Sequence, residues 1–517
     1  MRLLRHVPLR GLAVVLVTLI AGACLLSYYR AQPAAPAETD QRLKEQRLKD
    51  QARQRAVRAA MKHAWAGYRA HAFGKDELQP LSKSFNQRWG GWAITMVDAL
   101  DTLYLMGMMD EYEDAKRHVT TIDFSKTPPG HLVPVFEMTI RALGGLLGAY
   151  ELDNDPKLLQ KAKQVGDTLA KAFNTPTGLP YPALDLSGAN SNKAKAFVCI
   201  AEGGTIQLEF KKLAQLTGEQ RFRDIADRAA EALEKGDRPI KGLYPTFIEV
   251  VSGAYNVWSG YSVGSEADSF YEYLLKQHIL HNMHQPKFGE RYVTSVEAVK
   301  ERLLGRSASG LAFLGSLASP DASLIPEMQH LACFYPGLLA LGAQAMDRPQ
   351  DLTLAEELAR TCYLSYKSMA TGLGPERFSL AARKHRRAPP AANRPSVLEA
   401  EPPKGDISAA DPRYILRPET LETLFVLYRV TGDTKYQDWG WEIFQSIEKY
   451  TRVDDGYAAY LDVTRTTAAG NLQDSMESFF LAETLKYLYL LFSPTNLLPL
   501  NEFVLNTEAH PFRIMPN

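Results

Sequence analysis

The sequence predicts an all-α fold in which helical hairpins are arranged in a closed ring. Three observations lead to this prediction. From Gln87 onward, apolar residues recur mostly at helical spacing. One pattern, an amphipathic helix followed by an acidic turn and a second helix, returns several times at long and irregular intervals. Long Gly- and Pro-rich segments separate these hairpins, and such loops suit an enzyme pocket better than the short connections of an open solenoid.

The hairpins follow one another along the chain. In each, the turn offers a Gly or Asn with an Asp or Glu, which suits the end of one helix and the start of the next. Three clear copies and one degenerate copy read LGGLLGAYELDNDPKLLQKAKQVGDTLAKAF, LEFKKLAQLTGEQRFRDIADRAAEALE, LETLFVLYRVTGDTKYQDWGWEIFQSIEKY and LGAQAMDRPQDLTLAEELARTCYLSY. We expect the helical barrel to occupy residues 59–517. A mobile insertion is expected near 381–411, where basic, Pro/Ala-rich and acidic stretches follow each other.

The first thirty residues have a different character. A basic stretch precedes an apolar run over 11–26, and Tyr28–Tyr29 follows it. The basic flank and the aromatic pair favour an uncleaved signal anchor. The run is close to the short limit for a membrane span, so a cleaved signal peptide, or a poor lipoprotein signal at Cys24, stays an alternative. We expect a cytosolic tail and anchor over 1–30, a polar stem over 31–58, and a single-pass type II protein whose later residues lie in a lumen or outside the cell.

Charge and cysteine usage fit such a protein. Lys+Arg and Asp+Glu are equal at 59 each, which gives no electrostatic reason for a nucleic-acid partner, and we expect a monomer. Beyond Cys24 the chain has three cysteines, so an oxidising compartment permits one disulfide and one free thiol. Cys199 lies in the apolar, strand-like run AFVCIA beside carboxylates, which favours Cys333–Cys362 as the pair. No Asn-x-Ser/Thr acceptor occurs, so we expect no N-glycan on the protein itself.

Several carboxylates occupy positions that a simple amphipathic pattern does not explain. Glu137 has apolar neighbours, and Arg141 follows one helical turn later. Asp268 starts a helix after a Gly-rich loop, and Glu419 follows Arg417-Pro418. Each has a purely structural explanation: a surface ion pair, a helix cap and compensation of a helix dipole. Two more carboxylates in apolar surroundings are Glu202 and Glu483.

Taken together, these carboxylates indicate glycoside hydrolysis. Buried carboxylates cost several kcal/mol each unless they are paired, protonated or near a cation. Hydrolysis of a glycosidic bond uses one carboxyl group as acid and another as base. No P-loop, CxxC or HExxH motif competes with them. The run of oxygen-bearing residues over 506–511 suits Ca²⁺, although polar tails are commonly just solvated ends.

Long ordered segments resemble the class I α-1,2-mannosidases, glycoside hydrolase family 47, over essentially all of Gln87 to Phe512. They include VDALDTLYLMGM, VFEMTIRALGGLLGAYEL, DSFYEYLLKQ, HLACFYPGLLALG, YILRPETLETLFVLYRVTGD, DSMESFFLAETLKYLYLLFS and NTEAHPF. The resemblance implies an (αα)7 barrel with one Ca²⁺ at its base. It also implies inverting hydrolysis of terminal α-1,2-linked mannose from high-mannose N-glycans.

The resemblance assigns roles to residues. Glu137 matches the family's proposed general acid, Glu419 the proposed base, and Asp268 a third essential carboxylate whose role is debated. For inversion, acid and base should be roughly 6.5–9.5 Å apart. Thr507 matches the residue that gives Ca²⁺ a hydroxyl and a carbonyl oxygen. Positions that line the −1 mannose pocket or hold calcium-bound waters match Arg141, Glu202, His330, Arg417, Phe479, Glu483 and Glu508, and the family's disulfide matches Cys333 and Cys362.

Two positions depart from the family pattern. Glu266 stands where endoplasmic-reticulum-type members have Arg and Golgi-type members have an apolar residue. The side chain at that position helps to select the glycan branch, so the preferred branch is left open. The segment Glu202-Gly203-Gly204 is also richer in glycine than usual, and we expect it to loosen the pocket wall.

Alternatives within and outside the family remain at this point. The membrane is expected to be that of the endoplasmic reticulum or the Golgi. A degradation-linked mannosidase or lectin for misfolded glycoproteins shares the barrel, but retention of every catalytic carboxylate argues against a pure lectin. A bacterial secreted mannosidase would use the same chemistry in another compartment. A helical scaffold without enzymatic activity would not explain the carboxylate motifs.

Overall fold

The computed structural model describes residues 37–186, 197–381 and 405–516. The chain divides into two compact units, Met1–Arg53 and Gln54–Asn517. The anchor predicted for 1–30 lies outside the described residues. Across the three described ranges, no helix is both long enough and apolar enough to cross a bilayer.

Helix α2 runs from Ala37 to His71 without a break at residue 58, and the stem over 31–58 stays a prediction. The stretch from Ala37 to Ala66 contains neither Gly nor Pro. Side chains four residues apart also support it, for example Gln41 Nε2, which donates to Glu45 Oε1 at 3.0 Å. The polar composition of this segment therefore builds a charged helix.

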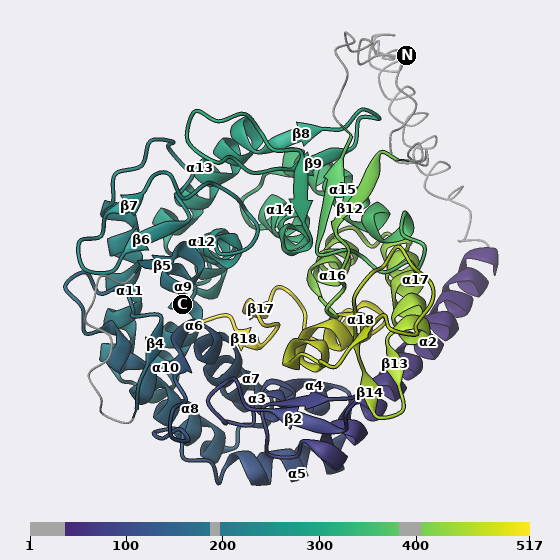
Figure 1. The fold of residues 1–517 in the computed structure, drawn as a ribbon, viewed down its shortest axis with the longest axis horizontal. Coiled ribbons are helices and arrows are strands. Elements are labelled where there is room, and N and C mark those ends of the chain that lie inside the picture. Colours follow the sequence, from purple (N-terminus) through teal and green to yellow (C-terminus); the bar gives the residue numbers. More distant parts are fainter. Residues whose placement is uncertain (1–36, 187–196, 382–404, 517) are drawn as a thin grey trace, which may run out of the picture. The chain divides into compact units, whose positions relative to one another are not determined.

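The second unit is a barrel of two concentric rings of helices (Figure 1). Inner segments contact one another in order, and α4 closes the ring by contacting η5. They are α3 (Ile94–Asp98) with α4 (Leu100–Leu105), η1 (Met138–Leu143) with α7 (Gly144–Asp153), α10 (Gln207–Thr217), α12 (Asp268–Leu280), α14 (Tyr335–Ala345), α16 (Glu419–Thr431), and η5 (Phe480–Thr484) with α18 (Leu485–Leu491).

The outer ring consists of the helices that follow the inner segments, together with α2 from Gln54 onward. They are α5 (Met109–Val119), α8 (Pro156–Leu169), α11 (Gln220–Lys235), α13 (Pro286–Arg302), α15 (Pro349–Lys367) and α17 (Lys435–Tyr450). This is the predicted (αα)7 barrel, and all four hairpins read from the sequence are confirmed: α7–α8, α10–α11, α14–α15 and α16–α17.

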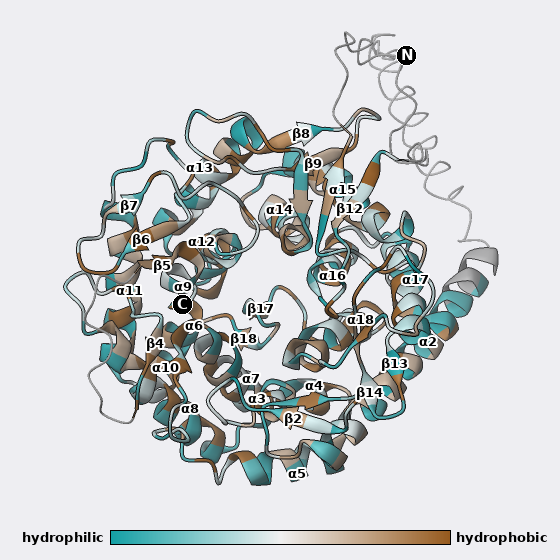
Figure 2. Cartoon of the chain, viewed as in Figure 1, coloured by the Kyte–Doolittle hydropathy of each residue, from teal (hydrophilic) through white to brown (hydrophobic). Residues whose placement is uncertain are grey.

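Burial explains which helix belongs to which ring. Every residue of α12 from Ser269 to Leu280 is buried, as expected for a helix enclosed on all sides. In α11 the largest buried side chains, Phe222 and Leu233, lie on one stripe with buried alanines, and the other face is polar. Figure 2 shows the same contrast, with hydrophilic residues on the outward sides of α5 and α8.

Short antiparallel strands stabilise the long loops. One three-stranded sheet joins β5 (Phe197–Cys199), β6 (Phe247–Glu249) and β7 (Tyr255–Asn256), so the strand-like run around Cys199 is confirmed. Another includes β11 (Arg377–Leu380) and β12 (Ile407–Asp411). β12 lies within the range 381–411 of the predicted insertion, and residues 382–404 of that range lie outside the described part.

The disulfide prediction is confirmed. Cys333 and Cys362 are bonded, which ties the 3-10 helix η3 (His330–Phe334) to the outer helix α15. Cys199 is a free and buried thiol.

The C-terminal hairpin, β17 (Phe503–Leu505) and β18 (Pro511–Arg513), lies inside the ring (Figure 1). Its turn approaches helix α7 so closely that a Cβ on Gly144 would come within 2.6 Å of Asn506 Nδ2. Asn506 Nδ2 donates to the Ile140 carbonyl at 3.0 Å, and Lys486 Nζ donates to the Ala509 carbonyl at 2.8 Å. The glycines of the LGGLLGAY motif thus make room for the turn that carries Thr507.

Candidate active site

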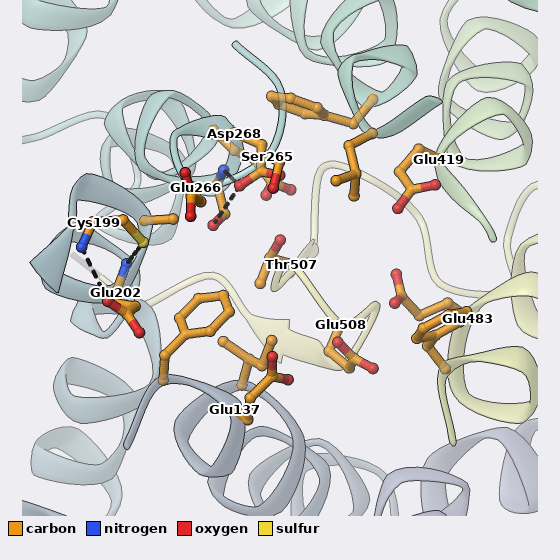
Figure 3. A pocket seen from close by; sticks show the side chains of 18 of the residues that line it. Glu137, Cys199, Glu202, Ser265, Glu266, Asp268, Glu419, Glu483, Thr507 and Glu508 are labelled. Atoms are coloured by element: carbon orange, nitrogen blue, oxygen red, sulfur yellow. Dashed lines mark hydrogen bonds between the residues drawn. The ribbon is translucent and has the colours of Figure 1, made fainter. Parts of the chain in front are cut away.

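A cavity of about 420 Å³ opens inside the barrel above the C-terminal turn (Figure 3). Nine of its lining side chains carry carboxyl groups, and only two of the others carry a cationic group, Arg141 and Arg417. The nine are Glu137, Glu202, Glu266, Asp268, Glu272, Glu419, Glu422, Glu483 and Glu508. Buried carboxylates need nearby cations to balance their charge, and the two arginines cannot balance nine carboxyl groups.

The predicted site residues meet at this cavity, with one exception. All three predicted catalytic carboxylates line it, as do Thr507 and the predicted substrate-binding residues other than His330. His330 is fully buried behind Glu419 and does not line the cavity. His330 contacts the carboxylate of Glu419, and its part in binding sugar or calcium-bound water stays a prediction.

Glu137 ends helix α6 (Val135–Glu137), and the π-helix η1 follows directly with Arg141 on the same face. Arg141 Nε donates to Glu137 Oε2 at 2.8 Å, so the predicted i,i+4 pair exists, but it faces the cavity instead of the protein surface. Single π-helical turns frequently occur at functional sites. A second one, η5, carries Glu483 into the same cavity.

Arg141 also connects the cavity to a buried polar network below it. Its guanidinium contacts Glu508, and its Nη1 lies 3.1 Å from Ser478 Oγ and 3.5 Å from Asp98 Oδ2. His510 Nε2 lies 3.0 Å from Asp98 Oδ1. The network fixes the guanidinium from several sides, so Arg141 presents a rigid positive charge to the cavity.

Glu419 begins helix α16 and is held by two neighbours. His330 Nδ1 lies 2.7 Å from Glu419 Oε2, and Arg417 Nη1 lies 3.6 Å from Oε1. Burial alone would raise the pKa of Glu419, but the His330 hydrogen bond and the Arg417 charge outweigh it and hold that pKa below its usual range. Glu419 is therefore an ionised carboxylate at neutral pH.

A further layer of residues, which the sequence did not indicate, positions these neighbours. His330 Nε2 lies 2.6 Å from the Tyr366 hydroxyl, and Arg417 Nε donates to Glu376 at 2.8 Å. Leu416, just before Arg417, has a positive φ of 70°, which costs a non-glycine residue about 1–3 kcal/mol. Its carbonyl accepts a hydrogen bond from Thr484 Oγ1 at 2.6 Å, which stabilises the strained backbone.

Asp268 starts helix α12 on another wall of the cavity. Its Oδ1 accepts a hydrogen bond from the Ser269 backbone at 2.9 Å, but Ala267 is the N-cap of the helix and has no side-chain cap bond, so Asp268 does not take the capping role that its sequence position allows. Burial raises its pKa to about 7, the Ser269 hydrogen bond opposes that shift, and the charges of Glu419 and Glu272 add to it. Asp268 therefore binds a proton near neutral pH, in contrast to Glu419.

Glu202 lies on the same wall, in helix α9 (Ile200–Gly204). Its side chain accepts from the Cys199 backbone at 3.0 Å, while Cys199 Sγ accepts from the Glu202 backbone at 3.4 Å, as Figure 3 shows. The expected loosening of this wall by glycine is wrong. A Cβ on Gly204 would lie 2.3 Å from Phe270 Cδ2, so the glycine permits close packing of α9 on α12.

Phe479 provides an apolar surface between the two cavity arginines. The Arg141 guanidinium lies 5.6 Å from the ring centroid, and that of Arg417 lies 6.0 Å from it. Both distances are within the range of cation–π attraction. The ring is therefore held at a fixed orientation against the cavity.

Two carboxyl groups that line the cavity, Glu272 and Glu422, were not predicted from the sequence. Lys276 contacts Glu272 and lies 3.6 Å from Glu422 Oε1. Glu272 is four residues after Asp268, and Glu422 is three after Glu419, so helical spacing places each on the face of a predicted residue. That spacing was the signal that could have identified them.

Thr507 lies at the base of the cavity, with Glu137, Asp268, Glu419, Glu483 and Glu508 around it (Figure 3). Burial raises the pKa values of Glu483 and Glu508 well above their usual range, and neighbouring carboxylates add to both shifts while Arg141 opposes them. Hard oxygen donors surrounded by carboxyl groups suit a divalent cation. In the described ranges no three His, Cys, Asp or Glu side chains are grouped to hold a metal directly. A cation here would rely on the oxygens of Thr507 and on water.

Comparisons with known proteins agree with this geometry. The profile of glycosyl hydrolase family 47 matches residues 60–514. The chain is 42% identical over 469 residues to the endoplasmic reticulum mannosyl-oligosaccharide 1,2-alpha-mannosidase of Homo sapiens, covering 89% of this chain and 64% of that protein. It is 40% identical over 496 residues to the human mannosyl-oligosaccharide 1,2-alpha-mannosidase IB, covering 93% and 71% of the two chains.

A solved structure is similar over the same range. The alpha-1,2-mannosidase from Trichoderma reesei superposes with a TM-score of 0.82 at 33% identity and covers 90% of this chain and 99% of its own. The chain spans less than two thirds of the length of the first human relative. The family profile, the two relatives and the superposition cover the whole barrel, and the chain belongs to glycosyl hydrolase family 47.

Proposed function

We propose that the protein hydrolyses terminal α-1,2-linked mannose from high-mannose N-glycans, with inversion at the anomeric carbon and dependence on Ca²⁺. The observation that carries this proposal is that Glu137, Asp268 and Glu419 line one cavity with Thr507, and that Glu419 is ionised as a base must be. Hydrolysis of a glycosidic bond uses one carboxyl group as acid and another as base. The names of the relatives, which are mannosyl-oligosaccharide 1,2-alpha-mannosidases, support this substrate.

In the proposed reaction, Glu419 takes a proton from water as the water oxygen bonds to the anomeric carbon. The bond between that carbon and the leaving sugar's oxygen breaks at the same time, and Glu137 donates a proton to this oxygen. Glu137 and Glu419 lie on different sides of the cavity with Thr507 between them, which leaves space for sugar and water (Figure 3). Asp268 is the third carboxyl group and supplies a second proton-holding site near pH 7.

The remaining lining residues position the sugar in this proposal. Phe479 offers an apolar face for the mannose ring, fixed by the two arginines beside it. His330 and Arg417 keep Glu419 ionised. The contact with Ser478 holds the Arg141 guanidinium in place beside Glu137. Glu202, Glu483 and Glu508 offer hydrogen bonds to sugar hydroxyls or to water.

Thr507 would hold Ca²⁺ through its hydroxyl and carbonyl oxygens. When bound, the ion would polarise sugar hydroxyls and offset the excess of carboxylates in the cavity. The surrounding carboxyl groups would orient the water molecules of its coordination shell. Glu266 lines the rim beside Asp268, and we propose that it takes part in selecting the glycan branch.

The proposed compartment is the secretory pathway, since one relative is named for the endoplasmic reticulum. We propose that residues 1–30 anchor the protein as a type II membrane protein with the barrel lumenal. N-terminal sequencing of the protein from membranes tests this part. An intact N-terminus supports the anchor, and a first residue at or near Ala31 overturns it.

The activity is tested by incubating the purified protein with a nine-mannose oligosaccharide and with α-1,3- and α-1,6-linked mannobiose as matched controls. Mannose release from the oligosaccharide alone, stopped by a chelator and restored by CaCl₂, supports the proposal. Release from the control disaccharides, or binding of the oligosaccharide without any release, would overturn it in favour of another linkage or of a lectin.

A further inference from the structure

Trp258 is the exception among the tryptophans. All six lie in the described ranges, and five are buried or half-buried, whereas the Trp258 side chain is 71% exposed. Leaving an indole in water forfeits a large hydrophobic gain. Single exposed apolar residues are common on proteins, however, so exposure alone assigns no role to Trp258.

The position of Trp258 is the second observation. In the β5–β6–β7 sheet, Cys199 pairs with Phe247, and Phe247 pairs with Asn256. Cys199 and Phe247 both line the cavity, so Asn256 lies at the cavity end of β7, two residues before Trp258. Figure 1 shows β5 nearer the barrel centre and β7 further out, so the loop after β7 lies on the outer side of this sheet.

The chain after Trp258 leads back to the cavity. Seven residues later it reaches Ser265 and Glu266, which line the cavity and are exposed. Trp258 therefore stands between two segments of the cavity wall, with polar side chains on both sides along the chain: Asn256 before it and Ser265 after it.

The loop that carries Trp258 is fixed at several points. The Gly260 carbonyl accepts hydrogen bonds from both the backbone and the hydroxyl of Thr246, each at 3.1 Å. Ser259 Oγ accepts from the Phe247 backbone at 3.0 Å. The Tyr261 hydroxyl donates to the Val257 carbonyl at 3.3 Å. A restrained backbone has little conformational entropy left to lose when its side chain binds a ligand, which is one property of a preorganised contact site.

We propose that Trp258 forms a distal sugar subsite, on which a mannose ring of the same oligosaccharide stacks while another mannose occupies the cavity. The inference rests on the proposed function and names the part of the substrate that is not cleaved. The C–H face of a pyranose is apolar and its hydroxyls project from the ring edge. An exposed indole, with the polar and exposed side chain of Asn256 accepting a hydrogen bond from its backbone N–H, matches both features. A protein partner would require a wider apolar patch than one side chain.

The test compares three variants on two substrates. Trp258→Ala removes the platform, Trp258→Phe keeps an aromatic face, and Val251→Ala removes an exposed apolar side chain from the β6–β7 turn, beyond the far end of β6 from the cavity. We expect Trp258→Ala to lower kcat/KM for the nine-mannose oligosaccharide roughly five- to tenfold, through KM. Its kcat/KM for α-1,2-mannobiose should stay within about twofold, because a disaccharide is too short to reach the rim. Trp258→Phe should keep most of the activity, and Val251→Ala all of it.

A binding measurement makes the result independent of turnover. In a Glu419→Gln background, the nine-mannose oligosaccharide should protect Trp258 fluorescence from acrylamide quenching, and mannobiose should not; the Trp258→Phe protein supplies the background signal. Equal kinetic effects on both substrates, no effect on either, or no protection by the oligosaccharide would overturn the subsite. If the wild-type protein releases mannose from neither substrate, the proposed function fails, and the quenching experiment alone still decides whether Trp258 contacts the glycan.

Discussion

Two walls of the cavity shift the pKa of a carboxyl group in opposite directions. On the α16 wall, Glu419 is paired with His330 and Arg417, which hold its pKa below the usual range. On the α12 wall, Asp268 makes no ion pair within the described ranges, and burial raises its pKa to about 7 although the Arg417 charge opposes the shift. Both carboxyl groups begin an inner helix of the same barrel. The difference therefore comes from the neighbours and not from the backbone, and it prepares one wall to accept a proton and the other to hold one.

The largest effect should come from removing the charge of the α16 wall. Glu419→Gln keeps the shape but cannot accept a proton, so kcat should fall by about 10²–10⁴-fold. Calorimetry should still detect oligosaccharide binding. Glu442→Gln, on the outer helix α17, is the matched control and should be fully active. A folded and active Glu419→Gln protein would remove Glu419 from the mechanism.

The next effect concerns the cation between the walls. Thr507→Val removes the hydroxyl at nearly constant volume, and we expect roughly a hundredfold loss of activity at limiting CaCl₂. Calcium should raise the melting temperature of the wild-type protein through ligand linkage, and the variant should respond less at the same concentration. Equal calcium-induced shifts for both proteins would show that Thr507 does not hold the ion.

A pH titration examines the α12 wall. The folded pKa of Asp268, about 7, exceeds the usual aspartate value near 3.9, so the folded protein binds more protons than the unfolded chain between these values. Asp268 thus contributes stability at low pH that is lost as pH rises toward 7. In chelator, Asp268→Asn should gain stability relative to wild type between pH 5 and pH 8, measured by urea unfolding. A constant difference over that range would contradict the raised pKa.

The smallest effect is expected behind the α16 wall. Tyr366→Phe removes the hydroxyl that contacts His330 and leaves the ring packed. His330 should then hold Glu419 less firmly, and the pKa of Glu419 should rise toward its usual value. We expect a loss of about three- to tenfold in kcat/KM with the acidic limb of its pH profile displaced to higher pH. A loss of activity with an unmoved limb would mean that Tyr366 acts only through packing.

The sequence predicts the barrel better than it predicts the contacts among the side chains around the cavity. Apolar periodicity and acidic turns predict hairpins such as α10–α11 because local sequence determines where those helices end. The cavity carboxylates of the family motifs are also found from the sequence. Contacts between distant segments cannot be predicted from local sequence. Tyr366 contacts His330, and Glu376 contacts Arg417, only after the ring closes. For the same reason, the sequence suggested that Gly204 loosens the pocket wall, whereas Gly204 makes a close contact with Phe270.

The anomer that is released first tests the central claim most directly. Proton NMR of a fresh digest of α-1,2-linked oligomannose can detect mannose before it mutarotates. If Glu419 activates water across the cavity from Glu137, β-mannose should appear first, and chelation should abolish its release. Initial release of α-mannose, or release that persists in chelator, would contradict the account.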